Sequence, residues 1–366
     1  MHFKRVFAAG LVVTAAFTGG TQAQEGKTSD YAKIASSTVE GYIRPATKTL
    51  VTTLSQLEKN TGTVCTTPNA ETNAAFSSAF KEAVVALAGV DFLRFGPMGQ
   101  ANIAQRLAFL PDGRGVVRRQ VTKITAKSDP TVTDPASLSI KSVALQGLTA
   151  LERIAYDADG KLILGQSGAQ KTFLCEYAES ITINLGGTAL ELEAAWAEPD
   201  GFSKTLLQPT KDGGVVQTHK EAAEMIFNGL TTGLIADKDQ YLLAVLGKTP
   251  KKANPKKAPF ARSGNAITYL SASLQGIQSA YLAGNYADQL EGEESWVANS
   301  LSFEFSNAQR LLAALPQPLQ ETGKQPDVRD KLLYLSTIIG GIKDIMAADL
   351  AGYLGLAGGF NALDGD

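Results

Sequence analysis

Apolar side chains recur at steps of three and four residues through most of this chain, and that period constrains the fold more than any other feature. Such stripes run over residues 31–57, 74–90 and 174–192, and residues 137–156 are apolar on most sides. A helix has 3.6 residues per turn, whereas a half-buried strand alternates every second residue. Since aromatic residues make up only 7% of the chain, the sequence predicts an all-α protein, with residues 137–156 as one helix buried among others.

The helical pattern is interrupted near residues 201–214, where glycine, proline and lysine gather. It restarts at Thr218, whose hydroxyl can cap a helix while Glu221 reaches back, as in a capping box. A chain of this length exceeds one small core, so we expect two helical bundles in tandem, residues 24–205 and residues 206–366. The helices expected in the second bundle cover residues 218–246, 265–282, 296–315 and 327–353.

The first residues have the pattern of a secretory signal peptide. Lys4 and Arg5 precede an apolar run over residues 6–17, and a cleavage site follows at Ala23. We therefore predict that residues 1–23 are removed and that the protein is periplasmic or secreted. No cysteine follows the apolar run, which argues against a lipid anchor, and no later run approaches the roughly 18 apolar residues of a membrane span.

The charge of the chain is nearly balanced, with 34 basic and 36 acidic residues. This balance argues against nucleic acid as the main partner, because nucleic-acid binding needs excess positive charge. One local exception is a connector over residues 248–259, where five lysines stand among three prolines. The connector is either a docking patch for an anion or a solvated linker, and we favour the linker.

Two cysteines, Cys65 and Cys175, remain in the mature chain. In an oxidising compartment an even pair usually forms a disulfide, so we predict this bond, with two buried free thiols as the alternative. A bridge closing a loop of this length could add about 4–5 kcal/mol to stability by the chain-entropy estimate.

Several short segments resemble the imelysin family, which includes insulin-cleaving metallopeptidases and iron-associated periplasmic proteins. They occur in the expected order over nearly the whole mature chain. They are Arg94-Phe95-Gly96-Pro97 with Phe109-Leu110-Pro111-Asp112, the segment Gln146 to Glu152, the segment Arg262-Ser263-Gly264-Asn265, and the tail from Gly359 to Asp366. The resemblance implies an imelysin-like fold of two helical bundles.

The second of these segments bears on the chemistry. The family's metallopeptidase motif places a histidine two residues after a glycine and three before a glutamate, so that both ligands share one helix face. Gly147 and Glu152 match this motif, but Thr149 stands at the histidine position. A neutral hydroxyl is a poor zinc ligand, and His219 is the only histidine after the predicted signal peptide. We therefore assign no catalytic residue and no metal ligand.

Glu152 still requires a partner, because an unpaired buried carboxylate is costly. It faces either a water-filled cleft or an arginine, and Arg94 and Arg262 are candidates from the family-like segments. We expect a polar ligand pocket between the bundles, bounded by Arg94, Thr149, Glu152, Arg262 and Ser263. The alternative is an ion-paired network that only locks the bundles together.

These observations favour a non-catalytic exported binding protein, whose link to iron uptake or envelope function is implied by the resemblance. Its ligand could be a metal complex, a peptide or an envelope protein, and no cofactor is assigned. Carboxylates and water could still bind iron or another divalent metal. The alternatives are therefore a divergent metallopeptidase with carboxylate ligands and an interaction scaffold in the envelope.

Overall fold

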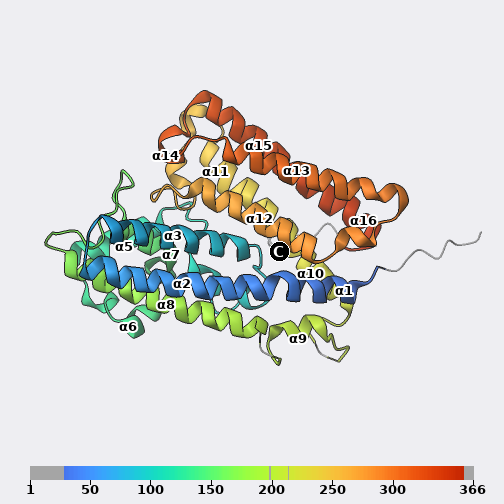
Figure 1. Ribbon diagram of the computed structural model, residues 1–366, viewed down its shortest axis with the longest axis horizontal. Helices are drawn as coiled ribbons and strands as arrows, with labels where there is room; N and C mark the ends of the chain where they lie inside the picture. Colours follow the sequence, from blue (N-terminus) through green and yellow to red (C-terminus); the bar gives the residue numbers. More distant parts are fainter. Residues whose placement is uncertain (1–28, 198, 213, 358–366) are drawn as a thin grey trace, which may run out of the picture.

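The computed structural model describes residues 29–197, 199–212 and 214–357, and its regular elements in these ranges are helices. Figure 1 shows two layers of long helices, one built from the first half of the chain and one from the second. The prediction of an all-α fold with two bundles is confirmed. The predicted signal peptide lies outside the described residues, and no described helix is long and apolar enough to cross a membrane.

Three long helices form the first bundle: α2 (Arg44–Thr66), α3 (Ala70–Val90) and α8 (Lys171–Ala197). Helix α2 lies between the other two and packs against both (Figure 1). Its inward stripe includes Leu50, Leu54 and Leu57, which are at most 1% exposed. The apolar residues spaced four and three apart, which predicted this helix, are therefore the residues that face the neighbouring helices.

Four long helices form the second bundle: α10 (His219–Ile235), α12 (Ala266–Ala283), α13 (Trp296–Ala313) and α15 (Pro326–Asp344). Thr218 caps α10 as expected, because its hydroxyl accepts a hydrogen bond from the Glu221 amide at 3.1 Å. Glu221 reaches back one residue further than in a capping box and accepts from the Gln217 amide. The predicted helix start at Thr218 is therefore correct.

The two bundles meet where α3 packs against α12. Two glycines allow this approach: a Cβ on Gly276 would lie 2.6 Å from the carbonyl oxygen of Gly89. The Tyr42 hydroxyl donates to the same carbonyl at 2.7 Å. Helix α1 (Tyr31–Thr38) adds a second contact, because it packs against α10.

Shorter helices connect these elements. They are α4 (Ile103–Leu107), α5 (Val116–Lys127), α6 (Pro135–Ser139), α7 (Gly147–Ala155), α9 (Phe202–Leu207), α11 (Leu243–Leu246), α14 (Leu319–Thr322) and α16 (Ala351–Leu354). Three-residue and four-residue 3₁₀ helices cover Gly96–Gly99, Pro130–Val132, Val143–Leu145, Pro250–Lys252, Pro255–Lys257, Tyr286–Gln289 and Gly292–Ser295. The predicted domain boundary at residue 205 falls within α9 and stays a prediction.

The single helix expected over residues 137–156 is wrong. The chain forms α6, a 3₁₀ turn and α7 instead, and Gly147 begins α7 with φ +75°. A side chain there is excluded, since a Cβ would lie 2.6 Å from the Leu107 carbonyl oxygen and 2.7 Å from that of Arg106. The apolar pattern identified the buried faces correctly, but the glycine sets the break.

Three of the long helices contain a π-helical turn, at Val39–Ile43, Ala236–Leu242 and Ile345–Leu350. These turns join α1 to α2, α10 to α11 and α15 to α16 without ending the helix. A π turn inserts one extra residue and rotates the side chains that follow it, and such turns are frequent at functional sites. The second turn supplies Asp237 and Tyr241 to the junction between the bundles.

The basic connector is not a free linker. The Asn254 amide donates to the Val245 carbonyl at 2.8 Å, and Ala253 and Pro255 are buried. Its lysines nevertheless remain exposed, Lys256 and Lys257 among them. The connector is therefore a packed segment that holds a row of cations at a fixed place on the surface.

The predicted disulfide is confirmed. Cys65 at the end of α2 and Cys175 near the start of α8 form the bond, with a Cα–Cα distance of 5.7 Å. Both residues are 7% exposed, so the bond lies within the packed end of the first bundle.

We expect the variant Cys65→Ser/Cys175→Ser to lose about 2–5 kcal/mol of unfolding free energy, because the bond closes a loop of 110 residues in the unfolded chain. Urea unfolding at equilibrium measures this loss. The wild type in a thiol reductant should match the double variant, and equal midpoints for the oxidised wild type and the variant would contradict the expectation.

Candidate functional site

Glu152 lies on α7 and points to the segment between the basic connector and α12. Its Oε1 atom accepts hydrogen bonds from the Ser263 amide at 2.8 Å and from the Ser263 hydroxyl at 2.7 Å. Within the described chain, no arginine lies within 4 Å of this carboxylate. The partner of Glu152 is therefore a serine that belongs to the other bundle, and the two bonds join the bundles.

Burial has the largest effect on the pKa of this carboxyl group. Glu152 is 9% exposed, and this burial raises the pKa of Glu152 above its usual range. The two bonds from Ser263 lower the pKa, as do the charges of Arg262 and Arg153, but desolvation is the largest effect.

Thr149 also makes a hydrogen bond within the protein. Its hydroxyl accepts a hydrogen bond from the Phe109 amide at 3.1 Å. The motif position that offers an imidazole in the metallopeptidases is here a neutral hydroxyl, and the neighbouring carboxylate is held by Ser263. This donor set does not fit a zinc ion, which prefers imidazole, thiolate and free carboxylate ligands.

The wider chain supplies no replacement ligand set in the part that the structure describes. No group of three or more histidine, cysteine, aspartate or glutamate side chains there is placed to hold a metal ion. His219 is exposed in the first turn of α10.

Arg262 does not pair with Glu152 but still contributes to the same seam. Its Nε donates to the Tyr156 carbonyl at 2.6 Å, which joins the segment before α12 to the end of α7. Arg262 and Ser263 thus make two consecutive contacts across the bundles.

Arg94 lies in a different cluster, built around Asp91 at the end of α3. Asp91 Oδ1 accepts from Arg94 Nη2 at 2.6 Å, and Oδ2 accepts from the hydroxyls of Tyr241 at 3.0 Å and Tyr269 at 2.8 Å. Arg94 Nη2 also donates to the Tyr241 hydroxyl at 3.1 Å. Burial raises the pKa of both tyrosines well above the usual value, and the Asp91 charge raises it further. This carboxylate therefore binds both bundles through fixed hydroxyl donors.

A second buried carboxylate, Asp237, lies on the π turn that follows α10. Its Oδ2 accepts from the Ser273 hydroxyl at 2.9 Å, while Oδ1 has no hydrogen-bond partner among the described residues. Burial raises the pKa of Asp237 well above its usual range, and the nearby charge of Asp91 adds to this effect. Both effects shift the protonation equilibrium of Asp237 toward the neutral form.

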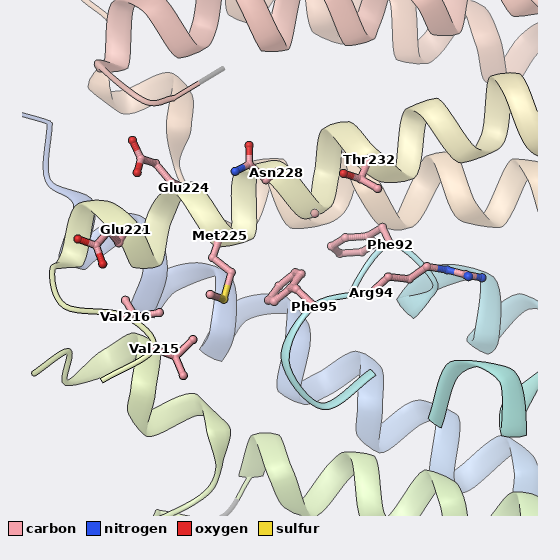
Figure 2. A pocket seen from close by; sticks show the side chains of 11 residues that line it. Phe92, Arg94, Phe95, Val215, Val216, Glu221, Glu224, Met225, Asn228 and Thr232 are labelled. Atoms are coloured by element: carbon pink, nitrogen blue, oxygen red, sulfur yellow. The ribbon is translucent and has the colours of Figure 1, made fainter. Parts of the chain in front are cut away.

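Next to Arg94 lies a pocket of about 340 Å³. Figure 2 shows Phe92 and Phe95, on the segment after α3, facing Met225 on α10. Arg94 and Thr232 lie toward one end of the pocket. Glu221 and Glu224 lie toward the other end. Gly229 permits this arrangement, because a Cβ there would lie 2.5 Å from the Phe95 ring. The remaining lining residues are Val215, Val216 and Asn228.

Two polar atoms of the pocket residues have no partner in the described chain: Arg94 Nε and Thr232 Oγ1. Both atoms are buried, and buried polar groups are nearly always hydrogen-bonded. By contrast, Glu221 and Glu224 accept from backbone amides of Gln217 and Ala357. The pocket thus has mainly apolar walls, and two of its lining residues each carry a buried polar atom without a partner in the described chain.

The structure divides the five predicted site residues. Glu152, Ser263 and Arg262 meet at one seam, Thr149 contacts Phe109 on the same side, and Arg94 joins the Asp91 cluster. Sequence reasoning missed Asp91, Tyr241, Tyr269 and Thr232. The spacing of Asp91 and Arg94, three residues apart at a helix end, was the one signal that could have indicated their pairing.

We expect Glu152→Gln to gain stability relative to the wild type as pH rises. The folded-state pKa is raised, so the ionised carboxylate costs free energy only in the folded protein, and this cost grows as pH rises above the unfolded value of about 4.3. Glu152→Ala should lose about 1–3 kcal/mol, because the Ser263 donors lose their acceptor.

Urea unfolding of the wild type and Glu152→Gln from pH 4 to pH 8 measures this change. Glu176→Gln is the matched control, since Glu176 is an exposed residue of α8. A wild-type stability that rises relative to Glu152→Gln over this range would refute the proposed effect of burial.

The chain and its fold are similar to those of known proteins. The imelysin family model matches residues 41–339. An imelysin-like protein from Psychrobacter arcticum has a TM-score of 0.77 at 19% identity, with 92% of this chain and 99% of that chain covered. A protein described as an iron-regulated protein A precursor from Parabacteroides distasonis has a TM-score of 0.66 at 13% identity, covering 88% and 97%. No curated protein matches the sequence. The family match covers well over half of the chain, so this protein belongs to the imelysin family.

Proposed function

We propose that this protein is an exported, non-catalytic binding protein with a role in iron supply or in the cell envelope. The observation that carries the proposal is the altered motif on α7. Thr149 replaces the histidine and accepts from an amide, and Glu152 serves as the acceptor for Ser263. Glu152 thus joins the two bundles, Thr149 binds within the first bundle, and the family fold would serve as a scaffold for ligand binding.

Two features support export. Residues 1–23 have the charge and apolar pattern of a signal peptide. The Cys65–Cys175 bond is typical of an oxidising compartment. The structural neighbour from Parabacteroides distasonis is also described as a precursor.

The iron connection rests on the name of that neighbour and on membership of the family. We propose that this protein binds iron as part of a larger ligand and does not hold it as a resident catalytic ion. The ligand could be a metal complex, a peptide or an envelope protein.

The pocket beside Arg94 is our proposed ligand site. An acceptor of the ligand would receive a hydrogen bond from Arg94 Nε or from the Thr232 hydroxyl, both without other partners in the described chain. Apolar parts of the ligand would contact Phe92, Phe95 and Met225. Pockets with mainly apolar walls and a few placed polar groups are the common form of small-ligand sites.

We expect the variant Thr232→Val to keep the stability of the wild type but to lose most of the ligand-induced thermal shift. The hydroxyl makes no bond within the described protein, so its removal breaks none there. Thermal-shift measurements with ferric salts, haem and mixed peptides provide the test, and the lost hydrogen bond should weaken binding about three- to tenfold.

Thr231→Val is the matched control on the same helix, because the Thr231 hydroxyl donates to helix carbonyls of Phe227 and Asn228. A shift lost equally in both variants would remove the support for this pocket. So would the absence of any shift with all three probes.

We also expect the wild type, purified without chelators or a histidine tag, to carry no stoichiometric metal and to cleave no insulin after zinc or iron is supplied. Elemental analysis and peptide mapping measure the two outcomes. Thr149→His restores an imidazole three residues before Glu152, so this variant should bind more zinc than the wild type. Chelator-sensitive cleavage by the wild type would instead establish a peptidase with carboxylate ligands.

A further inference from the structure

A second pocket, of about 520 Å³, has a strongly cationic wall. No carboxylate residue is among those that line it. Six of its lining residues carry positive charge: Arg114, Arg118, Arg153, Lys256, Lys257 and Arg262. In a chain whose charges nearly balance, this concentration on one cavity is a local feature of the fold.

Three segments far apart in the sequence supply these cations. Arg114 and Arg118 flank the start of α5, and Arg153 lies on α7. The basic connector contributes Lys256 and Lys257, and Arg262 lies between the connector and α12. Helices α5, α7 and α14 lie toward the same end of the molecule in Figure 1. Both bundles therefore contribute to the pocket.

None of the six cations forms an ion pair within the part of the chain that the structure describes. Other arginines do: Arg44, Arg94 and Arg106 each have a carboxylate oxygen within 2.8 Å. Within the described residues, the six cationic side chains donate one hydrogen bond, from Arg262 Nε to the Tyr156 carbonyl, and it leaves both terminal nitrogens of that guanidinium available. The pocket cations are thus without internal counter-charges in direct contact.

The cations are close enough to affect one another. Burial lowers the pKa of Arg153, and the charges of Arg262 and Arg118 lower it further. Burial likewise lowers the pKa of Arg262, and the nearby acids Glu152, Asp157 and Asp159 oppose this effect only in part. Glu152 is held by Ser263, and neither aspartate lines the pocket. Like charges held together cost free energy that a bound anion would offset.

The start of α5 does not itself provide the anion site. The carboxylate of Asp112 already accepts from the Val116 amide at 2.6 Å and from the Val117 amide at 3.0 Å. Any anion in the pocket would therefore bind guanidinium and ammonium groups. Guanidinium groups bind carboxylate and phosphate in a planar, two-point manner.

We propose that this pocket binds a small multivalent oxyanion, either a polycarboxylate or a polyphosphate. The number of unpaired cations calls for a ligand with several negative charges, and the volume suits a small molecule. The site is separate from the pocket beside Arg94 and does not rest on the proposed function. In this proposal the basic connector forms part of the lining of an anion-binding pocket.

Isothermal titration of the full mature chain with citrate and with pyrophosphate, at low ionic strength, tests the proposal. We expect Arg118→Gln and Arg153→Gln each to weaken binding about tenfold, since each removes a charge-assisted contact. Added salt should also weaken binding, because the pocket is open to screening ions. Both variants should melt no lower than the wild type without anion, because each relieves repulsion.

Lys123→Gln is the matched control: it removes one exposed charge from the same helix, α5, at a residue that does not line the pocket. Binding of citrate alone, or of pyrophosphate alone, supports the site and identifies its ligand chemistry. Absence of binding by both, or equal weakening by Lys123→Gln, would show only diffuse surface charge and overturn the proposal.

Discussion

The junction of the two bundles depends on the carboxylate of Asp91. Its three hydrogen-bond donors come from both halves of the chain: Arg94 beside it, Tyr241 on the π turn and Tyr269 on α12. A buried charge without partners is costly, and removing one partner of a buried pair typically costs 3–5 kcal/mol. The π turn is therefore more than a local irregularity, since the tyrosine it carries binds this carboxylate.

Glu152 obeys the same constraint with different partners. A buried carboxylate must be satisfied by hydrogen bonds, and Ser263 supplies an amide and a hydroxyl to Glu152. The residue thus keeps its place in the family motif while its contacts join α7 to the other bundle.

The apolar period predicted the bundles because helix faces that meet the core are set by local spacing, as Leu50, Leu54 and Leu57 show. The disulfide followed from the predicted oxidising compartment and the count of cysteines. The break before Gly147 did not, because it comes from the Leu107 carbonyl, which a sequence cannot place. For the same reason the sequence offers Arg94 only as one candidate partner of Glu152: a guanidinium can bind any carboxylate, and only the fold selects Asp91.

The two pockets differ in a way that follows from how charge is distributed between the bundles. Beside Arg94, the arginine is neutralised by Asp91, so an incoming ligand meets aromatic walls and single polar atoms. In the basic pocket no carboxylate of the described residues pairs with the cations, so a ligand there meets net positive charge. The first site can therefore recognise shape with little dependence on salt, whereas the second must respond strongly to ionic strength. Two ligands of different chemistry could occupy one frame without competing.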